Sequence, residues 1–420
     1  MHRTSTPLFF LAFATLAACG GSASSTASSS GGSSTSASSG GTGGASSAST
    51  GAQSSTTGTT GAGASSTSSV SASASSSSGG GDALAASFVY VGCNRIQKAD
   101  WDPVANPSSS NTAQLTRTFA DVTALPDKPT HFFFTGDLVL SLDPNTSVLA
   151  GQLDAWAQLF ASDPSGIAAK VPLVPMVGNH EMLLKTKING TKVELSNPGA
   201  DAVWTSWTAA HGFDSHAGNG PTQAAPNADA LSDDQSRLTY SFDDGAVHYV
   251  VLNTDTLTTA PDPATGSTQI GWIAMSWLAA DLAAAQAKAA VQHIAVFGHK
   301  PIVSPSGATG SDAIINPAFT GAIASLLDQT GKVRGYFCAH AHLWDAQKLP
   351  GQRGVYQVIA GNGGSQVETA WAQPTYGFTE VRFYQSGKVG VARHDRPVPA
   401  PYYQSPAAPA QGQPELVIVP

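Results

Sequence analysis

From Ser87 onward, short apolar runs that are typical of β-strands alternate with segments of helical periodicity. The strand-like runs are residues 88–91, 132–134, 173–177, 247–252, 294–297, 333–337 and 355–359. Between them, apolar side chains recur every three or four positions, as in Leu115, Phe119 and Val122. An alternation of this kind predicts an α/β (α+β) layered domain.

Residues 20–81 cannot take part in that domain. They consist of Gly, Ser, Thr and Ala with one Gln and one Val, so they carry no charge or aromatic ring and cannot form a core. We expect a flexible linker here, one catalytic domain over residues 82–400, and a Pro- and Gln-rich surface tail over 401–420. Residues 182–237 are polar and rich in Asn, Gly and Pro, which predicts a long functional loop.

Residues 1–19 have the pattern of an export signal. His2 and Arg3 precede an apolar stretch over 8–18 that ends at Cys19. The tetrapeptide 16–19, Leu-Ala-Ala-Cys, resembles a bacterial lipobox, whose cysteine becomes lipidated; the alternative is an ordinary signal peptide. We therefore expect a bacterial cell-envelope protein, held at the outer membrane or cell surface through lipid on Cys19, or else secreted.

Charge and cysteine content exclude several other classes. The formal net charge is −8 and no Lys/Arg run is present, which argues against a nucleic acid partner. After residue 20 no apolar run approaches the roughly 18 residues that span a bilayer. Besides Cys19, only Cys93 and Cys338 remain, so no disulfide framework is expected, although a single bridge stays open.

Five short polar motifs follow the strand-like runs directly. They are Gly92-Cys93-Asn94-Arg95, Gly136-Asp137, Gly178-Asn179-His180-Glu181, Gly298-His299 and His340-Ala341-His342. Because sites in open α/β sheets form beyond the carboxyl ends of strands, these five ends can converge. Asp, Asn and His are good metal ligands, and Cys93 could add a thiolate. The sequence has no zinc-protease helix, serine elbow or Walker phosphate loop to favour another chemistry.

In this order, the motifs resemble those of the calcineurin-like metallophosphoesterases, and most closely the purple acid phosphatases. The resemblance covers residues 88–384 and implies a four-layer α/β/β/α sandwich with a binuclear metal site at strand C-terminal ends. It implies that Asp137 bridges two metal ions. The ligands it implies are Cys93, Asp137 and His342 at the first ion, and Asp137, Asn179, His299 and His340 at the second. Because a neutral Asn at one ion and a thiolate at the other favour different ions, we expect iron with zinc or manganese.

The first site departs from the family pattern. Cys93 stands where the family normally has an aspartate. A bacterial alkaline phosphatase branch also has a cysteine here and uses it as an iron ligand. The alternative is that Cys93 is only a small, buried hydrophobic residue. Leu140 replaces the tyrosine of purple acid phosphatases, so no purple colour is expected. By resemblance, His180 contacts phosphate and assists the leaving group. Arg95 either clamps phosphate or pairs with an acid.

These features predict an acid-phosphatase-like phosphomonoesterase that acts outside the cytoplasm on a small phosphate ester. A hydroxide shared by the two metals would attack phosphorus. The same site would also suit a phosphodiesterase or nucleotide hydrolase. A third hypothesis is a non-catalytic surface binding module whose first metal site has degenerated.

Overall fold

The computed structural model describes residues 82–97, 110–222, 229–256, 271–306, 314–367, 374–404 and 407–418. All of them fall within one compact unit, Ser77–Pro420. The expected signal segment, including Cys19, and the expected linker 20–81 lie outside the described residues. None of the described helices is long and apolar enough to cross a bilayer.

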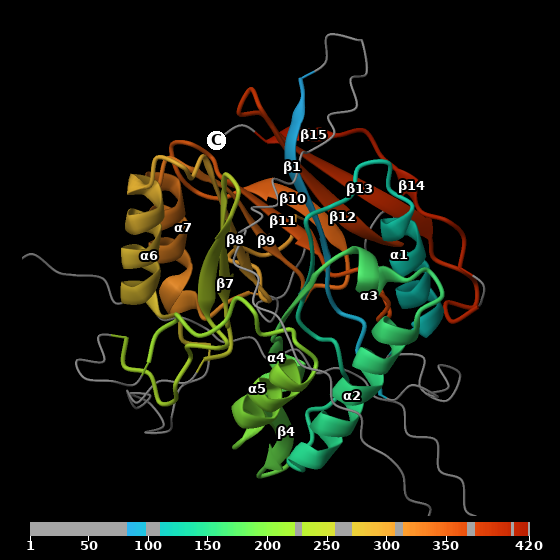
Figure 1. Cartoon of the computed structure of the whole chain (residues 1–420). Helices are drawn as coiled ribbons and strands as arrows, with labels where there is room; N and C mark the ends of the chain where they lie inside the picture. The colour runs from blue at the N-terminus through green and yellow to red at the C-terminus, as the bar shows by residue number, and fades with distance from the viewer. Residues whose placement is uncertain are drawn as a thin grey trace, which may run out of the picture. The chain divides into compact units, whose positions relative to one another are not determined.

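The first sheet has its parallel strands at one side. Its order is β14 (Gln411–Gly412), β13 (Val389–Pro397), β12 (Thr375–Tyr384), β1 (Leu84–Val91), β2 (His131–Thr135) and β3 (Leu173–Met176), with β15 (Leu416–Ile418) also paired to β13. Strands β1, β2 and β3 are parallel, so their carboxyl ends share one edge (Figure 1). Helices α1 (Thr112–Thr123), α2 (Thr146–Ser162) and α3 (Ile167–Lys170) pack on its outer face.

The second sheet also contains a set of neighbouring parallel strands and is covered by helices on its outer face. Its order is β10 (Trp344–Lys348), β11 (Tyr356–Ala360), β9 (Val333–Cys338), β8 (His293–Gly298), β7 (Val247–Leu252) and β6 (Tyr240–Asp244). Strands β7, β8, β9 and β11 are parallel. Helices α6 (Met275–Ala287) and α7 (Pro317–Gln329) cover the outer face of this sheet.

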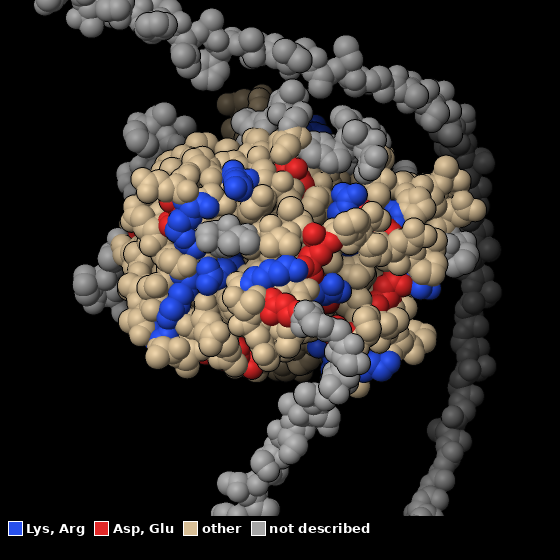
Figure 2. Space-filling view, turned by 90° about the horizontal axis from the view of Figure 1, so that it is seen from above, with Lys and Arg blue, Asp and Glu red and all other residues tan. Residues whose placement is uncertain are grey.

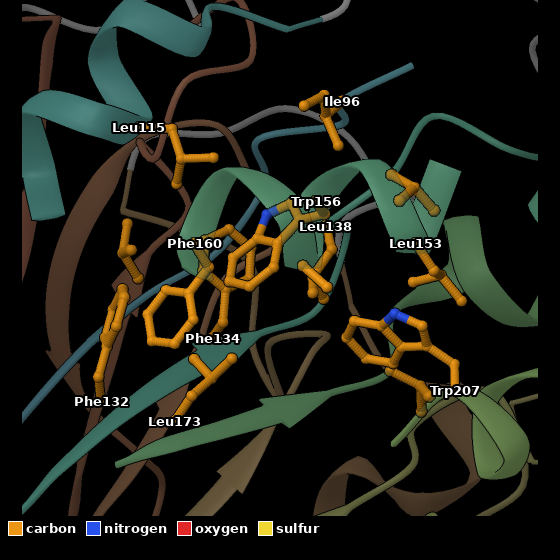
Figure 3. Close-up of a cluster of buried hydrophobic side chains, with 14 of the residues drawn as sticks. Ile96, Leu115, Phe132, Phe134, Leu138, Leu153, Trp156, Phe160, Leu173 and Trp207 are labelled. Atoms are coloured by element: carbon orange, nitrogen blue, oxygen red, sulfur yellow. The ribbon is translucent and has the colours of Figure 1, made fainter. Parts of the chain in front are cut away.

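Side chains of the central strands alternate between two cores. On β1, Phe88 and Tyr90 face a core shared with the second sheet, where Phe133 of β2 stacks on Phe297 of β8 with ring centroids 4.1 Å apart. Val89 faces the other way, into the core beneath α1 and α2. Figure 3 shows that second core, with Phe134 and Trp156 in contact. The layers are therefore helix, sheet, sheet and helix, as predicted.

The expectation of one long polar loop over 182–237 is wrong. The segment contains β4 (Leu183–Ile188), β5 (Thr191–Ser196) and helix α5 (Ala200–Ala210). An Asn189-Gly190 turn joins the two strands, and Asn-Gly between alternating apolar residues is a hairpin signal. Trp204 and Trp207 are helical residues of α5 that are buried in the core beneath α2, which explains why the segment is ordered (Figure 3).

The C-terminal segment also differs from the expected surface tail. β14 and β15 both pair with β13, and Ile418 is fully buried between the sheets. Burial of this apolar side chain stabilises the pairing of the last residues with the first sheet.

Candidate metal centre

The six predicted ligand residues come together where the carboxyl ends of strands from both sheets meet. Cys93 follows β1, Asp137 follows β2, Asn179 opens the short helix α4 (Asn179–Met182) after β3, His299 follows β8, and His340 and His342 follow β9. Several contacts join the sheets at this point. The ring nitrogen Nδ1 of His299 lies 2.7 Å from the carbonyl oxygen of Thr135, and the His340 backbone N–H donates to Cys93 Sγ at 3.2 Å.

Three possible ligand atoms lie close to a ring nitrogen of His299, and those of Asp137, His299 and His340 all lie within 4.8 Å of one another. From the Nε2 atom of His299, Asp137 Oδ1 lies at 3.1 Å, Asn179 Oδ1 at 3.2 Å and His340 Nδ1 at 3.1 Å. Metal–ligand bonds of about 2.0–2.2 Å place neighbouring ligands about 3–3.5 Å apart. Because the Thr135 carbonyl can only accept, His299 Nδ1 is the donor, which leaves Nε2 to face the other ligands. This group therefore fits a metal ion.

A second group consists of Cys93, Asp137 and His342, whose ligand atoms all lie within 4.8 Å of one another. Nδ1 of His342 donates to the Gln366 carbonyl at 2.8 Å, while its Nε2 atom is buried and has no hydrogen-bond partner among the residues that the structure describes. Burial lowers the pKa of His342 to about 3, so the ring is neutral, the form that binds metals. An orphaned buried nitrogen beside a thiol and a carboxylate fits a second metal ion.

Asp137 belongs to both groups and is fully buried. Burial alone would raise its pKa, but His299, His180 and Arg95 together lower it well below the usual range. Arg95 donates to Asp137 Oδ2 from Nη2 at 2.9 Å and from Nε at 3.1 Å. Of the two roles expected for Arg95, the structure therefore shows the ion pair with an acid. His180 lies close as well, with Nε2 at 3.9 Å from Asp137 Oδ2.

Backbone strain is concentrated in the loops that carry this site. Cys93, Arg95, Asp137 and His340 have positive φ angles of 62°, 58°, 55° and 63°. Such left-handed conformations cost about 1–3 kcal/mol each in residues other than glycine, and they are found preferentially at functional sites. The packing around the site holds these four residues in place. Their strain is therefore independent support for a functional site.

Glu181 is a site residue that the sequence did not assign. Its buried carboxylate accepts the backbone N–H groups of Gly178 at 2.7 Å, Asp137 at 3.0 Å and Val139 at 3.1 Å, which joins the loops after β2 and β3. Burial, and then the Asp137 charge, raise the pKa of Glu181 to about 7. The motif at 178–181 was visible in the sequence, but the sequence does not reveal that the Glu181 side chain accepts hydrogen bonds from backbone N–H groups.

A cavity of about 340 Å3 lies beside α4. It is lined by Met182 of α4, by the end of β5 and the start of α5, and by residues after β7 that include Asp255. Asp255 forms an ion pair with Lys300, the residue next to His299. None of the six predicted ligand residues lines this cavity, and its link to them is through Met182 of α4 and the Asp255–Lys300 ion pair.

The fold and the site define an α/β/β/α domain with residues that can hold metal ions at the junction of its two sheets. No protein-family model and no curated protein matches the sequence. Among solved structures, one described as "Structure of PhoD" is similar over 80% of this chain and 70% of its own chain, with 12% sequence identity and a TM-score of 0.48. A likeness at this level says nothing about activity.

Proposed function

We propose that the chain is a metal-dependent phosphoric ester hydrolase that acts on small phosphomonoesters. The observation that carries this proposal is the position of Asp137, a buried carboxylate that is common to two groups of metal-ligating side chains. Two ions held by these side chains would supply Lewis acidity toward phosphoryl oxygen and would lower the pKa of bound water. Iron with zinc or manganese suits the mixed Cys, His, Asn and Asp ligand set.

Arg95 and His180 have separate roles in this proposal. The Arg95 side chain is 18% exposed at the edge of the site, so its guanidinium can offset charge on the phosphoryl oxygens. His180 Nδ1 donates to the carbonyl of Leu140, which leaves Nε2 without a proton and able to accept one from the water molecule that attacks phosphorus. Burial lowers the pKa of His180 to about 3, so the ring begins the reaction neutral.

The cavity beside α4 supports a substrate with an organic group. In this proposal, phosphate binds at Arg95 and the ligand groups, and the alcohol part lies between Met182 and Asp255. We further propose that the enzyme works in the bacterial cell envelope or outside the cell, tethered by lipid on Cys19. The motif at 16–19 supports this location.

The test compares hydrolysis of p-nitrophenyl phosphate and bis-p-nitrophenyl phosphate before and after chelation. We expect faster monoester turnover, loss of that turnover on chelation, and recovery on addition of metal. His180→Gln should lower kcat by about 10²-fold, the usual contribution of a general acid–base. The control His211→Gln should leave kcat unchanged, because His211 contacts Asp154 at the surface.

The other outcomes separate the remaining hypotheses. Faster diester turnover would favour the phosphodiesterase or nucleotide hydrolase that the same ligands allow. No turnover of either substrate after metal addition would favour the binding module with a degenerate first site.

A further inference from the structure

Strands β4 and β5 form a hairpin, residues 183–196, that belongs to neither large sheet. Its base is fixed to the domain. Leu183 is fully buried, the Lys185 N–H donates to the carbonyl of Leu142 at 3.0 Å, and Asn197 Nδ2 donates to the carbonyl of Asp143 at 2.9 Å. Figure 1 shows β4 at the lower end of the molecule, beside α4 and α5. The 183–196 hairpin therefore starts at the edge of the candidate metal centre.

One face of the 183–196 hairpin carries exposed apolar side chains, Leu195 near its base and Ile188 beside its turn. The register places Leu184 opposite Leu195 and Ile188 opposite Thr191, all on the same face. Ile188 is 50% exposed and Leu195 40% exposed. Among the described residues, only Val417 is another large apolar side chain with such exposure. Exposed apolar groups concentrated on one short element indicate an interaction surface.

The other face of the 183–196 hairpin carries uncompensated positive charge. Lys185 pairs with Glu194 at 3.1 Å, but Lys187 stands directly opposite Lys192. Within the part of the chain that the structure describes, neither Lys187 nor Lys192 has an ion pair. Like charges opposite one another destabilise a two-stranded hairpin, which is only marginally stable in water. Folding alone therefore does not account for this pair of lysines.

The opposite end of the molecule has a different charge arrangement. Figure 2 shows it from above, with acidic side chains beside basic ones. Lys388, for example, pairs with Glu415 at 2.8 Å, and Arg382 with Glu380 at 2.7 Å. What distinguishes Lys187 and Lys192 is that they stand directly opposite one another on an exposed hairpin, in a chain whose formal net charge is −8.

We propose that the 183–196 hairpin docks on an anionic lipid surface. With the turn at residues 189–190 toward the membrane, Ile188 on one face enters the boundary between headgroups and acyl chains, while Lys187 and Lys192 on the other face contact the headgroups. A second copy of the chain fits less well. It would bring lysines against lysines, and two half-exposed apolar side chains are too few for the roughly 800 Å2 per partner of a stable interface.

The expected tether is compatible with this contact. A flexible chain of the length of residues 20–81 has an r.m.s. span on the order of 45 Å, so lipid on Cys19 would keep the domain near a membrane. Tethering converts a weak surface contact into an intramolecular one with a high effective concentration. The proposal does not depend on the proposed function, because it concerns only the hairpin and the lipid surface.

The test is co-sedimentation with vesicles, using the chain from residue 19 onward with Cys19→Ala. This form has neither the apolar signal segment nor an attached lipid, so only the domain can bind. Vesicles of 30% phosphatidylglycerol in phosphatidylcholine are compared with vesicles of phosphatidylcholine alone. We expect binding to the anionic vesicles only, and weaker binding at about 1 M salt, where the Debye length is about 3 Å.

The decisive variant is Lys187→Glu/Lys192→Glu. It keeps a like-charge pair across the hairpin, so the folded state and the melting temperature should be little changed. Each lysine near an anionic surface contributes about fivefold to binding, so the variant should bind at least about 30-fold more weakly. The control Lys128→Glu/Lys170→Glu makes the same change in net charge at exposed positions outside the hairpin, and should bind like the unaltered chain.

Equal binding of the hairpin variant and the control would overturn the proposal, as would equal binding to uncharged vesicles. If the protein bound no vesicle and instead formed a dimer that the hairpin variant dissociates, the surface would be a contact between copies and not a lipid contact.

Discussion

Replacing Gly178 with alanine tests whether the position of Asp137 controls both metal binding and catalysis. A Cβ atom at residue 178 would lie 2.5 Å from Asp137 Oδ1, 2.6 Å from the Asp137 backbone nitrogen and 2.9 Å from His299 Cε1. Ordinary van der Waals contact begins at 3.4 Å, so the carboxylate must move by about 1 Å. The φ angle of Gly178 is −118°, which alanine adopts freely, so the change acts through this contact and not through backbone strain.

The size of the effect follows from that displacement. A misplacement of about 1 Å at a reacting centre costs about 10²-fold in rate, which corresponds to about 2.7 kcal/mol in activation free energy. We therefore expect Gly178→Ala to lower kcat for a monoester about 100-fold and to reduce the metal content. Steady-state kinetics and elemental analysis of the same preparations measure both, and thermal unfolding shows whether the variant is folded.

Gly151→Ala is the matched control. Gly151 lies within α2, and a Cβ atom there would have no neighbouring atom within 4 Å, so alanine should change neither kcat nor metal content. Since alanine favours helix over glycine by about 1 kcal/mol, this control should be slightly more stable. If Gly178→Ala kept kcat and metal content within twofold of the unaltered chain, the role assigned to Asp137 would be refuted.

Two further substitutions test the thiol at the first site and the pH dependence of stability. Cys93→Ala should release mainly one of two metal ions in elemental analysis, whereas Cys338→Ala, on β9, should release neither; a change in thermal stability alone would mean that Cys93 only packs. Burial lowers the pKa of His248, but Asp281 and Asp243, at 2.9 and 2.5 Å, raise it overall above 6.5. Its stabilising effect is thus complete below pH 6.5 and lost as pH rises through the raised pKa. In denaturant unfolding, His248→Gln should therefore be more destabilising at pH 6 than at pH 9, and an equal loss at both would contradict the ion pairs.

The sequence predicted the strands that carry the site because they are buried on both faces and read as continuous apolar runs. β12 escaped prediction because polar residues are buried along it. Glu380 is 1% exposed, and its carboxylate is bonded by Arg382 and by His394 of β13. Burial of the Glu380 carboxylate is favourable only because β12 pairs with β13, which brings His394 to it. The sequence of β12 therefore lacks the alternation of apolar and polar residues that would predict a strand. The β4–β5 hairpin was missed because short, half-exposed strands carry a weak apolar signal.

That the candidate ligand residues lie together could be predicted because each follows a buried strand at a glycine or in a His pair. The groups that orient them could not. His299 is held by the carbonyl of Thr135 and His342 by the carbonyl of Gln366, and any residue supplies a carbonyl. The pairing of Arg95 with Asp137 likewise depends on how the loops after β1 and β2 meet, which the spacing of residues in the sequence does not reveal.

We propose that Asp137 is shared by two metal ions. The decisive measurement is the metal content per chain of the purified protein beside Asp137→Asn, a substitution of nearly the same shape. We expect two ions per chain in the unaltered protein and loss of both together in the variant. One ion or none in the unaltered protein, or a variant that keeps both, would contradict the proposal.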